Sequence, residues 1–96
     1  MVKKAKRAAE AVALESIPNV GPAIAGDLRR LGIDTPSALI GQDPCRLYVD
    51  LCILTGARQD PCVLDTFIAI TRFMAGDQPH PWWHYTKERK RMKIMR

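Results

Sequence analysis

Thiol and imidazole side chains are the groups in this 96-residue sequence best suited to metal binding or nucleophilic catalysis. They are Cys45, Cys52, Cys62, His80 and His84. The cysteines form no Cys-x-x-Cys pair of a zinc site, and prolines on both sides of His80 disfavour a regular helix that would align it with His84. Since a Gly-rich phosphate loop and a nucleophile–base motif are also absent, the sequence predicts neither a metal site nor an enzyme.

The three thiols are expected to be reduced. The sequence shows no secretory signal and no apolar run of the roughly 20 residues that a membrane span needs, so we expect a cytoplasmic location, where disulfides are rare. Cys45 and Cys62 are predicted to stand at the starts of two antiparallel helices, too far apart for a bond. Because a helix N-terminus can lower the pKa of a thiol, both are candidates for a lowered pKa.

A different chemistry, anion binding by backbone N–H groups, is predicted between residues 14 and 33. Pro18 and Asn19 are expected to end one helix, with Asn19 and Gly21 at positive φ, and Pro22 to begin the next helix where its missing N–H costs nothing. Such a hairpin leaves N–H groups at a helix N-terminus free to meet an anion. These N–H groups belong to Val20, Gly21, Ala23 and Ile24.

The helix that follows is expected over residues 22–31. Ile24, Leu28 and Leu31 form an amphipathic stripe, and Gly32 ends the helix. Small residues at positions 25 and 26 would let a neighbouring helix approach closely.

The segment from Leu14 to Ile33 resembles the helix-hairpin-helix motif, which binds the DNA backbone without reading its sequence. Two positions depart from the motif: Asn19 replaces its usual first glycine, and Ala23 stands where DNA-binding versions commonly have a basic residue. The resemblance implies phosphate contacts by the hairpin amides, and it allows a monovalent cation held by the hairpin carbonyls. The alternative is a helical corner used only for packing.

Basic residues gather at the two ends of the chain. Of the net charge of +5, residues 1–7 contribute four basic side chains and residues 87–96 contribute six, whereas the segment between them is net acidic. Charge blocks of this kind bind polyanions or serve only to solubilise the ends. The candidate phosphate contacts in the second block are Lys87, Arg89, Lys90 and Arg91.

The hydrophobic pattern predicts an all-α fold of five helices and no strand. The first covers residues 5–16, the second 22–31, and a short third follows Thr35 and Pro36, with Leu39 and Ile40 buried. The tripeptide Asp-Pro-Cys then occurs twice, at 43–45 and 60–62, and it predicts helices over 44–54 and 61–74 because Asp caps a helix and Pro begins one.

This order of helices looks like a double helix-hairpin-helix domain of the SAM-like type over residues 1–75, with a degenerate second hairpin around Gly56. Residues 76–96 form a Trp-containing basic extension that is packed on this domain or trails from it. In the second hairpin, Arg58 and Gln59 would meet a phosphate. Alternatively, Arg58 would pair with Asp60 or Asp65, or bond the carbonyls at the end of the preceding helix. In the extension, Trp82 and Trp83 would stack on unpaired bases or cap the core.

Residues 51–65 and 81–83, together with the hairpin, resemble the small bacterial pathogenicity locus family. The hairpin and second helix are also similar to the C-terminal domain of TfoX-like competence regulators. The first resemblance implies an all-helical helix-hairpin-helix fold and no defined activity.

We therefore expect a non-enzymatic, sequence-neutral DNA-binding domain without an obligatory cofactor. The alternative is a helical protein-interaction module whose acidic body contacts a protein partner.

Overall fold

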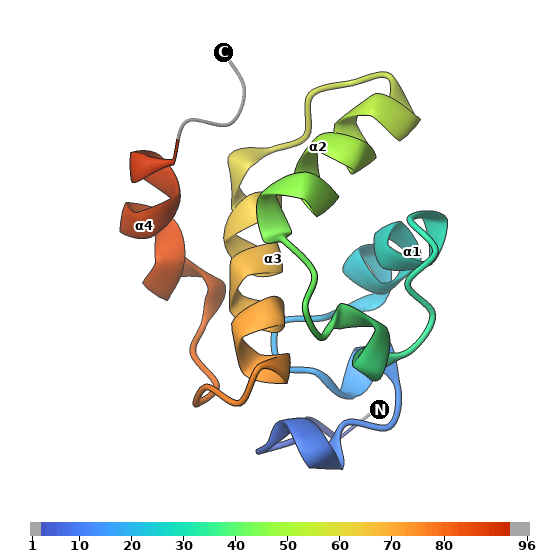
Figure 1. The fold of residues 1–96 in the computed structure, drawn as a ribbon, viewed down its shortest axis with the longest axis vertical. Coiled ribbons are helices and arrows are strands. Elements are labelled where there is room, and N and C mark those ends of the chain that lie inside the picture. Colours follow the sequence, from blue (N-terminus) through green and yellow to red (C-terminus); the bar gives the residue numbers. More distant parts are fainter. Residues whose placement is uncertain (1–2, 93–96) are drawn as a thin grey trace.

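The computed structural model describes residues 3–92, and all regular secondary structure in that range is helical (Figure 1). The α-helices are α1 (Pro22–Arg30), α2 (Pro44–Thr55), α3 (Pro61–Met74) and α4 (Thr86–Arg91). The single-turn 3₁₀ helices are η1 (Ala8–Glu10), η2 (Leu14–Ser16), η3 (Pro36–Leu39) and η4 (Trp82–Tyr85). The all-α class is thus confirmed for residues 3–92, with four α-helices instead of the expected five.

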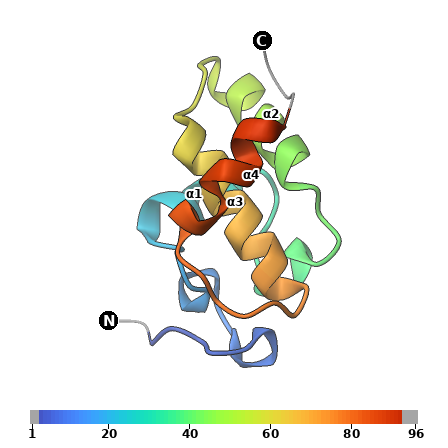
Figure 2. The same cartoon turned by 90° about the vertical axis from the view of Figure 1, so that its left-hand side faces the viewer.

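Helix α3 forms the centre of the fold. Ten of its fourteen residues are buried, among them Phe67, Ile70 and Phe73. Helix α2 packs against one side of it and η4 with α4 against the other, as Figure 1 shows and as Figure 2 shows with α4 facing the viewer. A central helix contacted from several sides explains why its hydrophobic residues are not confined to one stripe.

The local signals for helix starts and ends are confirmed. Asp43 and Asp60 each accept a hydrogen bond of 2.9 Å from the N–H two residues later, and a proline follows each of them. Helices α1 and α2 end in the paired hydrogen bonds of a Schellman motif, with Gly32 and Gly56 at φ of 86° and 66°. The predicted bounds of these helices are therefore correct to within one residue.

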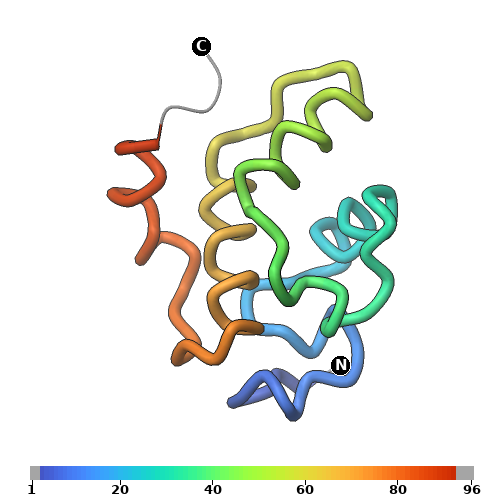
Figure 3. Tube along the Cα trace, viewed as in Figure 1, coloured from blue at the N-terminus to red at the C-terminus, as the bar shows by residue number. Residues whose placement is uncertain are grey.

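The first predicted helix is wrong. Residues 5–16 form the two separate turns η1 and η2, with Val12 86% exposed between them. The tube in Figure 3 shows this blue segment lying along the chain that leads into α1, where the Ala5 N–H donates to the Ser16 carbonyl at 2.7 Å. An isolated helix of this length is marginal, and burial of Leu14 and Ala5 holds the segment in a different path.

Two other expectations about packing fail in part, since Ala25 is fully buried as a small residue in a packed position but Gly26 is not closely approached. The third helix is the single turn η3, in which Leu39 is buried but the following Ile40 is 58% exposed. Gly26 has no atom within 4 Å of the place that a Cβ would occupy, so no neighbouring helix approaches it closely. One helix was not predicted: α4 lies in the basic extension, where no hydrophobic stripe indicates a helix.

Candidate nucleic-acid interface

The first hairpin is built on buried side chains that flank a tight turn. Leu14, Ile17 and Val20 are fully buried, and the Val20 N–H donates to the Ile17 carbonyl at 3.1 Å. Asn19 adopts the predicted positive φ, 76°. Val20 therefore anchors the turn, because its N–H is already bonded to the Ile17 carbonyl and its side chain lies in the core.

Three N–H groups remain at the start of α1. The first helical hydrogen bond runs from the Ala25 N–H to the Gly21 carbonyl at 3.0 Å, and within residues 3–92 no hydrogen bond uses the N–H of Gly21, Ala23 or Ile24. The Ala23 side chain is exposed, whereas that of Ile24 packs partly against the core. These unpaired donors lie at the positive end of a nine-residue helix, where an anion is favoured.

The expectation that Gly21 adopts positive φ is wrong. Its φ is −99°, and the space where a Cβ would stand has no neighbouring atom within 4 Å. The unusual backbone angle is taken by Asn19 alone, so Gly21 contributes open space in front of the amides and no special conformation.

Asn19 also ties the C-terminal segment to the hairpin, a role that the sequence did not indicate. Its side-chain amide donates to the His80 carbonyl at 2.8 Å, and its amide oxygen accepts the Trp82 N–H at 3.1 Å. Next to this clamp, Trp83 is 63% exposed and meets the half-buried Trp82 edge to face, with 5.5 Å between ring centroids. The exposed indole therefore stands one residue beyond a segment fixed to the hairpin.

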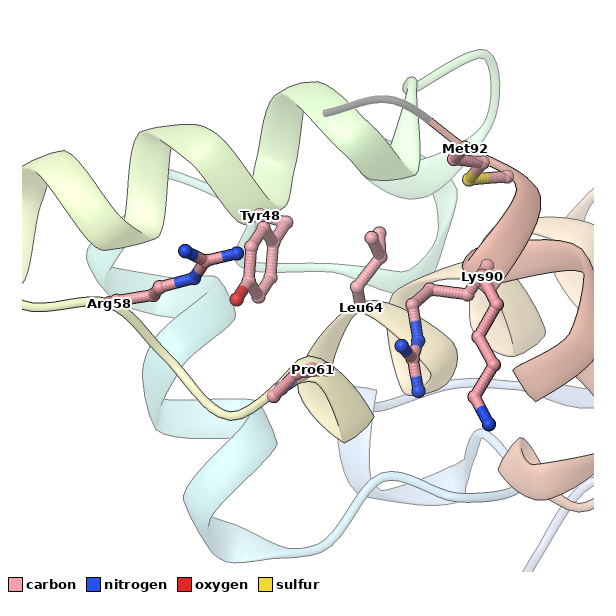
Figure 4. Close-up of a pocket in the computed structure, with 7 residues that line it drawn as sticks. Tyr48, Arg58, Pro61, Leu64, Lys90 and Met92 are labelled. Carbon is pink, nitrogen blue, oxygen red and sulfur yellow. The ribbon is translucent and has the colours of Figure 1, made fainter. Parts of the chain in front are cut away.

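A second group of basic residues surrounds a cavity of about 200 Å³ at the start of α3 (Figure 4). Arg58 from the loop between α2 and α3 and Lys90 from α4 lie on opposite sides of the Tyr48 ring and Leu64. Within residues 3–92, no ion pair includes Arg58, so its predicted pairing with Asp60 or Asp65 is not formed. Lys87 and Arg91 are likewise exposed on α4 and outside those ion pairs.

Two of the residues predicted to contact phosphate, Gln59 and Arg89, form hydrogen bonds within the protein. The Arg89 guanidinium donates to the fully buried Asp65 carboxylate at 2.8 Å, and the Thr86 hydroxyl donates to the other Asp65 oxygen at 2.7 Å. Arg89 is thus committed to neutralising a buried charge. The Gln59 side chain donates to the Thr55 hydroxyl at 2.9 Å, and the Gln59 carbonyl accepts from the Tyr48 hydroxyl.

The start of α1 and the loop between α2 and α3 lie toward a common side of the molecule, whereas α4 lies across α3 from α1 (Figure 1). In Figure 2, the start of α1 and the loop between α2 and α3 both lie toward the left, with α4 crossing in front. A polyanion lying along this side would meet the free amides of α1 at one point and the exposed Arg58 guanidinium of the loop at another.

Residues 7–91 match the pathogenicity locus family. The chain belongs to this family. One relative of this pathogenicity locus protein is the mitomycin resistance protein McrB of Streptomyces lavendulae, which is 40% identical over 79 residues, covering 82% of this chain and 75% of that protein. No solved structure matches the chain.

The thiols of this pathogenicity locus protein are all free, as predicted. The expected lowering of the pKa of two of them is wrong: burial, together with a neighbouring aspartate, raises the pKa of Cys45 and of Cys62. Both thiols are partly buried, and desolvation by that burial is the largest cause of the rise in each pKa.

The two histidines stack on each other, with ring centroids 4.1 Å apart. No cluster of three metal-ligating side chains occurs within residues 3–92. In the same range, no helix is long and apolar enough to cross a membrane.

Proposed function

We propose that this protein is a small non-enzymatic domain that binds the DNA backbone without sequence specificity, through a helix-hairpin-helix arrangement of the SAM-like type. The observation that carries this proposal is the set of three unpaired N–H groups, those of Gly21, Ala23 and Ile24, at the start of α1. Backbone donors fixed at a helix N-terminus suit a phosphate and read no base, so they would give affinity without sequence preference.

The exposed cations around the second hairpin support the same proposal. Arg58 and Lys90 border the cavity at the start of α3, and Lys87 and Arg91 extend the charge along α4. Because phosphate neutralisation releases counterions, such residues would contribute attraction that falls with salt concentration. The proposed interface thus keeps seven of the ten residues predicted from the sequence and assigns Val20, Gln59 and Arg89 to its support.

A salt titration tests this function directly. We expect the untagged chain to bind a short fluorescent duplex of arbitrary sequence with a dissociation constant in the roughly 1–100 μM range of non-specific binders. Fluorescence anisotropy at several KCl concentrations gives log K against log salt, with a slope of about −0.9 for each phosphate neutralised on duplex DNA. Equal affinity for two unrelated duplexes would support sequence-neutral binding, whereas no binding to any DNA at low salt would reject the proposal.

The second candidate is a protein-interaction module, and one observation favours it. Ile53 and Leu54 expose 72% and 55% of their surface on α2, and Ile53 and Met92 both line an open groove of about 610 Å³. Apolar groups grouped on a surface often mark a protein contact. This candidate is preferred if DNA binding fails and Ile53→Glu abolishes the binding of a protein partner without unfolding the chain.

The name of the Streptomyces relative motivates a cellular test. We propose that a mitomycin-sensitive host producing this chain survives exposure to mitomycin better than the same host with an empty vector. If the protection depends on DNA binding, a variant that folds but no longer binds DNA in vitro gives none. If the hosts with the intact chain, the variant and the empty vector survive equally well, this protein does not protect against mitomycin.

A further inference from the structure

The carbonyl oxygens of the first hairpin converge on a single positive charge. The Lys4 ammonium donates to the carbonyls of Glu15, Ile17 and Val20, at 2.7, 3.3 and 2.5 Å. Three separate acceptors need three N–H donors, which a lysine side chain offers only when it is protonated. The group at the centre of these oxygens is therefore a cation.

The lysine comes from outside the hairpin and is held in place by its neighbour. The Ala5 N–H donates to the Ser16 carbonyl, and the Ala5 side chain is buried in the core. Two consecutive residues of the N-terminal segment thus bind carbonyls from one short stretch, residues 15–20. The backbone next to Lys4 is therefore fixed beside the hairpin, which keeps the ammonium close to the carbonyls.

The Lys4 residue as a whole is exposed, but its hydrogen bonds to the carbonyls of Ile17 and Val20 are partly buried. Burial lowers the pKa of Lys4, and the nearby Glu15 carboxylate opposes that change. Glu15 itself is held by the Arg29 guanidinium at 3.0 Å, so its charge is shared. The carbonyl oxygens consequently supply most of the direct coordination of the ammonium.

We infer that Lys4 occupies, with a tethered ammonium, the place among these three carbonyls where the resemblance allows a free monovalent cation. Converging backbone carbonyls replace the water around an alkali ion, and an ammonium group has a similar size to K⁺. The intact chain consequently needs no free K⁺ at its hairpin, whereas a chain without the Lys4 ammonium presents vacant carbonyls to an ion of this class. The inference concerns the fold of the hairpin and does not rest on DNA binding.

The test compares Lys4→Met with Lys3→Met, a substitution that removes the same charge from a neighbouring exposed lysine. Thermal unfolding is measured in KCl and in choline chloride of equal ionic strength, because choline is too large for the site. In choline chloride, Lys4→Met should unfold roughly 4–8 °C below the intact chain, the shift expected for the net loss of about one ordinary hydrogen bond. KCl should restore much of that loss with a saturable dependence, while the intact chain and Lys3→Met respond equally to both salts.

Thallium NMR gives a direct measurement of the ion. Tl⁺ resembles K⁺ in size, so the ²⁰⁵Tl signal should shift and broaden with Lys4→Met and not with the intact chain or Lys3→Met. The inference is overturned if Lys4→Met binds no Tl⁺ and unfolds at the same temperature in both salts. It is also overturned if the intact chain shows a saturable K⁺ dependence, because Lys4 would then not occupy the site.

A measurement on the intact chain covers the case in which Lys4→Met does not fold. Trace acetylation of the native protein, read by peptide fragmentation in a mass spectrometer, reports how accessible each amine is. Because three carbonyls hold its ammonium, Lys4 should react several-fold more slowly than Lys3 and Lys6 in the native protein, and all three should react alike in urea. Equal native rates would overturn the inference.

Discussion

A carboxylate placed beside the three free amides should separate folding from DNA binding. Ala23 is exposed in the first turn of α1, and its N–H has no acceptor within residues 3–92. In Ala23→Glu, the new negative charge lies at the positive end of the helix, which stabilises a helix by about 0.3–1 kcal/mol. The melting temperature of the variant should therefore stay the same or rise.

DNA binding should change in the opposite direction. If a phosphate accepts from these N–H groups, the carboxylate repels it, and the loss of one hydrogen bond to a charged group costs about 1.5–3 kcal/mol. At about 1.4 kcal/mol for each tenfold change, affinity should fall roughly 10- to 150-fold. The slope of log K against log salt should also become shallower by about 0.9 if one phosphate contact is lost.

Fluorescence anisotropy with the intact chain, Ala23→Glu and Gln78→Glu measures these effects. Gln78 is exposed in the loop after α3, so its substitution alters the net charge by the same amount away from the hairpin. Gln78→Glu should bind DNA nearly as well as the intact chain. The reasoning is refuted if Ala23→Glu binds with unchanged affinity, or if both variants weaken equally, because net charge alone would then explain the binding.

Three further predictions follow from the same geometry. Arg89→Met should lower the free energy of unfolding by about 3–5 kcal/mol in a urea titration because it leaves the buried Asp65 carboxylate unpaired. The control Arg91→Met, on the exposed face, should change that free energy by no more than about 0.5 kcal/mol. A similar small effect of both would show that the buried pair contributes little to stability. Trp83→Ala should weaken binding to single-stranded DNA by about 5- to 150-fold, the value of one stacked base, with duplex binding unchanged. Ile53→Ala serves as the exposed apolar control. If Trp83→Ala binds single-stranded DNA as tightly as the intact chain, Trp83 has no stacking role. The N–H of Cys62 lowers the pKa of the Asp60 carboxyl. The stability that this cap contributes is therefore present at neutral pH, above the ordinary carboxyl range, and is lost as the pH falls through the lowered pKa. Asp60→Asn should consequently reduce the dependence of stability on pH in acid, and an unchanged acid profile would count against this cap.

The resemblance to the family and the bounds of most helices could be predicted from short-range sequence patterns. The two Asp-Pro-Cys segments predict the starts of α2 and α3 because a carboxylate cap and a proline act on the next few residues only. The same holds for Gly32 at the end of α1 and for Asn19 at positive φ. These features depend on backbone geometry within a few positions, so they can be read from the sequence without knowledge of the fold.

Tertiary contacts decided the features that the sequence patterns missed. Residues 5–16 have helix-favouring composition, yet their path is set by the burial of Ala5 and Leu14 and by hydrogen bonds to the hairpin. Helix α4 lacks an apolar stripe and is fixed by polar bonds, among them those of Thr86 and Arg89 to Asp65.

The same distinction separates the residues proposed to bind DNA from those that support them. By type and charge, Arg89 is equivalent to Arg58 and Lys90, and only a partner 24 positions away in the chain shows that Arg89 is already paired. Likewise, Lys4 belongs by sequence to a basic end, but the fold places its ammonium on three carbonyls at positions 15–20. The sequence by itself determined which groups are available for chemistry and where most helices begin; the tertiary structure decided which of those groups are occupied, because their partners lie far along the chain.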